Sequence, residues 1–162
     1  MEELFTDYYH SPIGRVYIQC SRQAVLRVHF IDDSDEEAAV QSLSETPRIL
    51  KQALDQIAEY FEGTRRLFDL PVALYGPSFY QKVWEGLMYV PYGTTCSYGA
   101  LAAAVGNPKA ARAVGLANNR NPISIIIPCH RVIGANGTLV GYGGGIHRKK
   151  WLLDWEKNNT FV

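Results

Sequence analysis

The sequence predicts an α+β protein with two domains, a small antiparallel sheet with one helix followed by a mainly helical domain. Strand-like segments begin the chain, and helical periodicity dominates after residue 47. The charge also changes sign, since residues 1–78 hold 7 Lys+Arg and 13 Asp+Glu (net −6), and residues 79–162 hold 9 and 3 (net +6). We therefore predict domains at 1–78 and 79–162, the second facing an anionic partner. Chance segregation of charge is the alternative.

The composition is that of an ordinary globular protein. Of 162 residues, 47% are hydrophobic and 20% charged, which excludes disordered, collagen-like and coiled-coil classes. No apolar run reaches the roughly 18 residues of a membrane span, and the N-terminus is acidic, so we expect a cytoplasmic protein without a membrane partner. Three widely separated cysteines without a C-x-x-C pair indicate reduced thiols rather than a disulfide framework or a zinc finger.

The first half begins with two strand-like segments. The two segments, residues 16–18 and 25–30, have a strand-like composition, with turn signals before and between them. Residues 47–61 then carry apolar side chains on one helical stripe, with Gly63 directly after it. This order predicts a hairpin or small sheet followed by one helix, and residues 75–78 read as the linker.

The second half predicts a helix-turn-helix. After a helix over 79–89 capped by Ser78, Ser97 can cap a short helix that ends at Gly106, and Asn107-Pro108 can open a second helix over 109–118. The second helix combines tiny residues with two cations, a composition that permits close approach to a phosphate-lined groove. Close packing against another helix is the alternative. The residues concerned are Lys109, Ala110, Ala111, Arg112, Ala113 and Gly115.

Residues 123–127 contain four isoleucines and are expected to be extended, ending at Pro128. Asn136-Gly137 signals a tight turn. A glycine-rich loop over 141–145 precedes a final helix over 146–157.

Cys129 is the candidate nucleophile, because it follows this apolar segment and directly precedes His130 and Arg131. A thiol needs a nearby base or cation to ionise at neutral pH. Neighbouring residues of an extended strand point to opposite faces, so a bend or a bridging water must connect Cys129 with His130. A buried structural cysteine beside a satisfied histidine is the alternative.

Glu156 lies on an otherwise apolar face near the end of the final helix, where the helix dipole disfavours negative charge. A tertiary partner such as His130 would explain it. Cys129, His130 and Glu156 could then form a relay in which the carboxylate orients the imidazole and the imidazole takes the thiol proton.

The run Ile127-Pro128-Cys129-His130-Arg131-Val132 resembles the active-site signature of the O6-alkylguanine-DNA alkyltransferases, also called methylated-DNA–protein-cysteine methyltransferases. The resemblance covers essentially all of residues 79–162, and it is loose in the first half. Its further motifs are Ser97-Tyr98, the segment 106–115, Asn121-Pro122, Gly141-Tyr142-Gly143-Gly144-Gly145, Trp151-Leu152-Leu153 and Glu156.

The resemblance implies a ribonuclease-H-like N-terminal domain, a winged-helix-like C-terminal domain and a role for each matching residue. Cys129 would accept the alkyl group, His130 would act as base through a water, Glu156 would orient it, and Asn121 would brace the turn. Tyr98 would assist the guanine leaving group, and Arg112 would enter the duplex in place of the flipped nucleotide. Further DNA contacts would come from Ser97, Lys109, Ala110, Ala111, Ala113 and Gly115, and Val132, Tyr142, Gly143 and Gly144 would line the base pocket.

The reaction implied by the resemblance is direct repair of O6-alkylguanine, and of O4-alkylthymine if the pocket admits it, in double-stranded DNA bound by the minor groove. The thioether product is permanent, so each molecule reacts once and needs no cofactor. We expect a monomer that can cluster on DNA. Cys20 and His29 suggest the zinc site of some relatives, but the other ligands have no match, so we expect no metal.

Two other functions use the same residues. A thiol hydrolase would use Cys129, His130 and Glu156 repeatedly, and turnover separates it from an alkyl acceptor. A non-enzymatic lesion sensor would bind alkylguanine without reacting, but such proteins lack the acceptor cysteine that this chain has.

Overall fold

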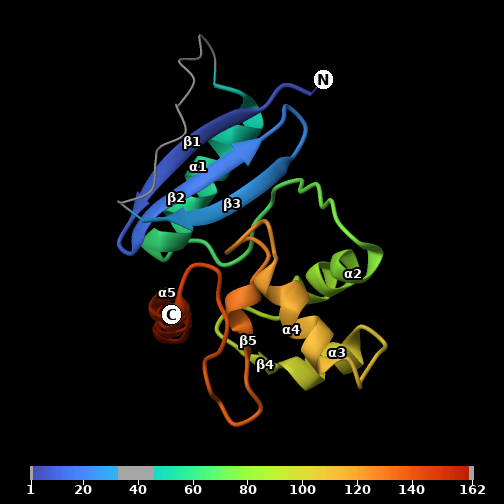
Figure 1. Ribbon diagram of the computed structural model, residues 1–162. Coiled ribbons are helices and arrows are strands. Elements are labelled where there is room, and N and C mark those ends of the chain that lie inside the picture. The colour runs from blue at the N-terminus through green and yellow to red at the C-terminus, as the bar shows by residue number, and fades with distance from the viewer. Residues whose placement is uncertain (1, 33–45, 161–162) are drawn as a thin grey trace. The chain divides into compact units, whose positions relative to one another are not determined.

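The computed structural model describes residues 2–32 and 46–160, and these form two compact units, Met1–Leu74 and Tyr75–Val162. The predicted α+β class is confirmed, because an antiparallel sheet with one helix precedes a mainly helical region (Figure 1). In the described part of the chain, no helix combines the length and the apolar character needed to cross a bilayer.

The first unit is a sheet backed by a helix. Its elements are β1 (Phe5–Ser11), β2 (Gly14–Cys20), β3 (Val25–Ile31) and α1 (Arg48–Glu62). The strands pair antiparallel in the order β1-β2-β3, and α1 covers one face of the sheet (Figure 1). Alternation along β2 sends Val16, Ile18 and Cys20 into the core, and Ile57 and Tyr60 of α1 are fully buried as well. The helix ends at Gly63, whose φ of 86° suits glycine.

The second unit consists of short helices around one short parallel strand pair. Its elements are α2 (Ser78–Leu87), β4 (Cys96–Ser97), α3 (Tyr98–Ala104), α4 (Ala111–Asn119), η1 (Cys129–Arg131), β5 (Val132–Ile133) and α5 (Ile146–Asn158). Strand β4 pairs with β5 through Cys96 with Val132 and Ser97 with Ile133. Because α3 follows β4 and η1 precedes β5, this pairing brings the start of α3 beside the segment that carries Cys129.

In the second unit, two helices begin at other residues than the sequence predicted. Ser97 does cap α3, since its side chain accepts a hydrogen bond from the Ala100 N–H at 3.0 Å. Helix α4, however, begins at Ala111 and not at 109, because Asn107 opens a turn in which its carbonyl accepts the Ala110 N–H at 3.0 Å. Helix α2 likewise begins at Ser78, with Pro77 at the cap position and no side-chain cap.

Residues 123–127 were expected to be extended, and this prediction was wrong. The Ile126 and Ile127 N–H groups donate to the Ser124 and Ile123 carbonyls at 2.8 and 3.0 Å, so the segment folds into consecutive turns. Ile125 has a φ of 71°, a rare and strained value for a β-branched residue. The amide of Asn121 explains why the local preference is overridden. It donates to the carbonyls of Ile123 (3.3 Å) and Ile127 (2.7 Å), and its oxygen accepts the Ile123 N–H (3.0 Å).

Candidate active site

Cys129 opens a single turn of 3-10 helix whose backbone is held from both sides. Its N–H donates to the Ile127 carbonyl at 2.8 Å, and Asn121 donates to that same carbonyl. Its own carbonyl accepts the Val132 N–H and the Asn118 side-chain amide, the latter at 3.2 Å. Asn118 in the last turn of α4 and Asn121, which follows the helix, therefore fix the peptide groups on either side of the sulfur. Of the two, only Asn121 was predicted from the sequence to have a role here.

His130 and Arg131 follow Cys129 in this helical turn, and both bind the carboxylate of Glu156. His130 Nε2 and Glu156 Oε2 are 2.6 Å apart, and both side chains are buried. Arg131 donates from Nε to Oε1 at 2.8 Å and from Nη2 to Oε2 at 3.1 Å. The Gly93 N–H adds a contact to Oε1 at 3.2 Å. The predicted pairing of His130 with Glu156 is thus present in the structure.

Burial, neighbouring charges and hydrogen bonds together set the protonation state of this pair. Burial alone would raise the pKa of Glu156, but His130 and Arg131 hold that pKa far below its usual range, so the carboxylate is ionised. Burial lowers the pKa of His130, although Glu156 opposes the shift, so the imidazole is neutral near pH 7. An ionised carboxylate can only accept, so Nε2 carries the hydrogen and Nδ1 keeps a lone pair. The pair is oriented to receive a proton at Nδ1.

The Cys129 thiol is buried, at 4% exposure, and the groups around it have opposing effects on its pKa. Burial raises the pKa of the thiol, whereas hydrogen bonding to Asn121, the charge of Lys149 and hydrogen bonding to Ser124 lower it. Lys149 was not among the site residues predicted from the sequence. Its signal was the spacing of seven residues before Glu156, which places both on one face of α5.

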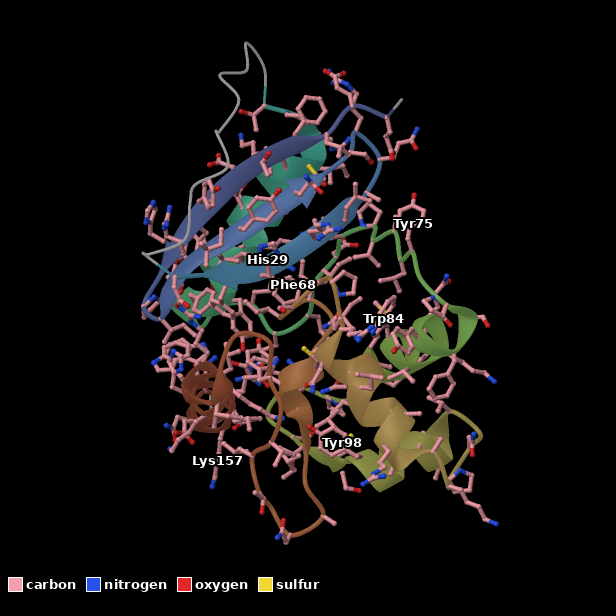
Figure 2. All side chains as sticks on the ribbon, viewed as in Figure 1. His29, Phe68, Tyr75, Trp84, Tyr98 and Lys157 are labelled. Carbon is pink, nitrogen blue, oxygen red and sulfur yellow. The ribbon has the colours of Figure 1, made fainter. Side chains whose placement is uncertain are left out.

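Tyr98, Lys149 and the loop before α5 meet at one carbonyl. The Tyr98 hydroxyl and the Lys149 ammonium both donate to the Val140 oxygen, each at 2.9 Å, and the two donors lie 3.5 Å apart. Lys149 is fully buried. Tyr98 lies between α4 and this loop (Figure 2). A phenol beside an ammonium group is a ready hydrogen-bond donor for an incoming molecule.

A cavity of about 440 Å³ opens beside Tyr98. Tyr98, Ala111, Arg112, Gly115, Asn119, Val140 and Gly141 line it. Helix α4 therefore presents its small residues to open space, and Ala113 is exposed, so tight helix packing does not account for them. Arg112 is exposed at the first turn of α4. Lys109 and Ala110 precede the helix, and Lys109 is exposed as well.

The four predicted pocket residues are not among those that line this cavity. Val132 is fully buried in β5. Gly143 is exposed, whereas Tyr142 and Gly144 are half-buried. Their contact with a base stays a prediction.

Cys20 and His29 cannot hold one metal ion together. Cys20 points into the core of the first unit, whereas His29 stacks on Tyr17 at 4.6 Å on the opposite face of the sheet (Figure 2). Within residues 2–32 and 46–160, no group of three or more His, Cys, Asp or Glu residues is placed to bind a metal.

Two family models match the chain. The model described as 6-O-methylguanine DNA methyltransferase, ribonuclease-like domain, matches residues 4–74. The model described as 6-O-methylguanine DNA methyltransferase, DNA binding domain, matches residues 78–158.

Curated proteins and solved structures agree with these models. The methylated-DNA--protein-cysteine methyltransferase of Mycobacterium leprae is 47% identical over 94% of this chain and 92% of its own length. The protein of the same name from Methanosarcina acetivorans is 44% identical, over 91% and 95%. The structure of Mycobacterium tuberculosis OGT in complex with DNA superposes with a TM-score of 0.83 at 43% identity, covering 96% and 93%. The chain therefore belongs to the 6-O-methylguanine DNA methyltransferase family.

Proposed function

We propose that this protein repairs DNA by moving an alkyl group from the O6 atom of guanine to the sulfur of Cys129. The observation that carries the proposal is the buried contact of 2.6 Å between His130 and Glu156 beside a buried cysteine, in a chain of this family. The reaction is stoichiometric and irreversible. A bond forms between sulfur and the alkyl carbon, and the bond from that carbon to O6 breaks.

The thiol proton leaves toward His130. Glu156 fixes the tautomer that exposes the Nδ1 lone pair, so His130 accepts the proton through a water, and the imidazolium is stabilised by the carboxylate. Lys149 and Asn121 favour the thiolate at the sulfur itself. No carbonyl is attacked, so the site needs a soft nucleophile and no oxyanion hole.

The leaving guanine needs a proton donor, and Tyr98 is placed for that role. Its hydroxyl lies at the cavity and is already donating to a carbonyl, the kind of acceptor that a purine ring atom can replace. The Lys149 ammonium at 3.5 Å stabilises negative charge on the phenol oxygen.

Double-stranded DNA is the substrate carrier, and α4 is its docking element. A duplex buries the O6 position, so the nucleotide must be flipped out at a cost of a few kcal/mol. Arg112 at the start of α4 is exposed and lines the cavity, so it can fill the gap left by the nucleotide. Lys109 and the small residues around Ala111 allow the backbone to approach the minor groove, and Ser97 fixes the start of α3. We extend the proposal to a cytoplasmic monomer that acts without a cofactor.

Intact mass spectrometry after incubation with a duplex containing O6-methylguanine tests the reaction. We expect a gain of one methyl group per protein molecule, located on Cys129 by peptide mapping, and no further turnover with excess lesion. An unmodified duplex is the control. Repeated product release without a mass gain would instead support the thiol hydrolase, and binding without any reaction would support the lesion sensor.

The role of Arg112 has its own test. Arg112→Ala should slow repair of duplex DNA by about tenfold or more and leave reaction with free O6-benzylguanine nearly unchanged, because a free base needs no flipping. Single-turnover rates on the two substrates make the comparison. Equal losses on both would refute a role in flipping.

A further inference from the structure

Three buried side-chain polar atoms in the described part of the chain have no hydrogen-bond partner, and all three belong to residues around Cys129. They are Asn118 Oδ1, His130 Nδ1 and Tyr142 Oη. Asn118 donates to the Cys129 carbonyl from its other amide atom, and His130 follows Cys129 in the chain. Buried polar groups are paired in more than about 90% of cases, so three unpaired atoms among the residues that contact Cys129, follow it in the chain or interact with it electrostatically point to a place for another polar molecule.

The three atoms have complementary hydrogen-bonding roles. His130 Nδ1 is an acceptor, because Nε2 carries the hydrogen that Glu156 binds. Asn118 Oδ1 is an amide oxygen and also accepts. Tyr142 Oη is the one donor of the three. Burial raises the pKa of Tyr142 far above its ordinary value and the neighbouring Cys129 raises it further, whereas the nearby Ser124 hydroxyl and the charge of Arg148 lower it, so on balance the phenol keeps its proton.

The backbone holds Tyr142 in place independently of its hydroxyl. The Tyr142 carbonyl accepts the Gly145 N–H at 2.9 Å, and Arg148 donates to the Gly144 carbonyl at 3.0 Å. The φ of 93° at Gly145 completes this turn. The turn therefore fixes the backbone of Tyr142, and the hydroxyl can be removed without releasing the loop.

We propose that Tyr142 is a positioning residue whose hydroxyl holds the water that carries the proton from Cys129 to His130. This inference rests on the proposed function. The phenol donates to the water oxygen, the water donates one hydrogen to His130 Nδ1, and the thiol donates to the water. On ionisation the water passes a hydrogen to Nδ1 and receives the thiol hydrogen, so the water is regenerated and the charge separates into thiolate and imidazolium. With a donor fixing its oxygen and two partners beside it, the water makes the three hydrogen bonds typical of a buried water.

The test is Tyr142→Phe, which removes one hydroxyl and keeps the ring. Tyr89→Phe is the matched control, because Tyr89 is 86% exposed and has no role in the site described above. The rate at which iodoacetamide alkylates Cys129 is measured from pH 5 to 10 by peptide mass spectrometry, and melting temperature verifies folding. This electrophile carries no guanine, so its rate reports the ionisation of the thiol alone. In the described part of the chain, the charged and titratable groups that interact with the thiol or with its histidine are Tyr98 from α3, Arg131 from η1, Tyr142 from the loop before α5, and Lys149 and Glu156 from α5.

We expect the midpoint of the Tyr142→Phe profile to move to higher pH, with the rate at pH 7 about fivefold lower and the rate at pH 10 unchanged. Methyl transfer from the DNA lesion should slow by the same factor at pH 7. The Tyr89→Phe profile should match that of the unchanged protein.

Two outcomes would overturn the proposal. An unchanged iodoacetamide profile with slower DNA repair would show that the hydroxyl contacts the substrate and not the water. An unchanged rate in both assays would show that the hydroxyl has no part in the reaction. Failure of the unchanged protein to gain a methyl group from DNA would refute the proposed function separately, since the iodoacetamide assay does not depend on it.

Discussion

Cys20 and Cys129 are both buried cysteines, but their surroundings differ in kind. Cys20 lies at the end of β2 with 0% exposure, and burial raises the pKa of its thiol to about 11. Cys129 is 4% exposed, and there Asn121, Lys149 and Ser124 oppose the effect of burial. Burial alone makes the Cys20 thiol inert, whereas the oriented groups around Cys129 oppose the effect of burial, as the proposed acceptor role requires.

The same contrast holds for the two units. In the described part of the first unit the buried polar residues are Arg15, Ser21 and Gln56, and Gln56 serves the backbone by pairing with both the N–H and the carbonyl of Asp69 at 2.9 and 3.0 Å. Those of the second unit include the charged side chains of Arg131, Lys149 and Glu156. Buried charge is costly unless it is paired, so its concentration at one thiol reflects chemistry rather than stability.

The largest expected effect comes from replacing each of the two cysteines, one at a time, with alanine. Cys129→Ala should abolish the mass gain from O6-methylguanine DNA, because it removes the acceptor sulfur. Cys20→Ala should keep the full gain and lower stability by about 1–2 kcal/mol through the small cavity it leaves. Intact mass and urea unfolding measure the two effects. A mass gain that persists in Cys129→Ala would show that Cys129 is not the acceptor.

Glu156→Gln should lower the transfer rate by about a hundredfold, since His130 loses the anion that sets its tautomer. It should also cost about 3–5 kcal/mol of stability, because Arg131 is left buried without its counter-ion. Asp154→Asn on the same helix is the control, since its pair with Lys150 is exposed and weak. Single-turnover rates and urea unfolding are measured for both variants. Similar losses of rate and stability in the two would contradict the role of Glu156 in orienting His130.

Lys149→Met should raise the pKa of the Cys129 thiol, because the variant loses a buried cation that favours the thiolate. The reaction with iodoacetamide should then be about tenfold slower at pH 7 and recover at high pH. Lys150→Met removes an exposed cation from the next position and should leave the profile unchanged. A slowing that persists at pH 10 would mean that Lys149 acts on geometry rather than on ionisation.

The smallest effect concerns acid stability. The pKa values of His130 and Glu156 are both lower in the folded state than in the unfolded chain, so the unfolded chain binds more protons as the pH falls. The stability that His130 contributes is complete above its ordinary pKa of about 6.5 and falls as the pH drops below that value, whereas the contribution of Glu156 is lost only on further acidification below about pH 4.5. All three tryptophans, Trp84, Trp151 and Trp155, belong to the second unit, so their fluorescence during urea unfolding measures this loss. The loss should be smaller in Glu156→Gln.

The sequence by itself determined the helices and strands whose periodicity is strong, and it predicted that His130 pairs with Glu156. The stripe from Ile49 to Phe61 predicted α1, and an acid on an otherwise apolar helix face predicted a partner for Glu156. The helix prediction succeeds because apolar periodicity and capping act within a few residues.

Only the tertiary structure decided how the nucleophile is held. Four isoleucines predicted an extended segment over 123–127, but the Asn121 amide folds it into turns, and a side-chain contact of this kind outweighs strand propensity. Asn118, Lys149 and Tyr142 reach Cys129 from α4, α5 and the loop between β5 and α5. The spacing of these three residues in the sequence does not predict that they lie close together, because packing and buried hydrogen bonds form only when all elements are in place.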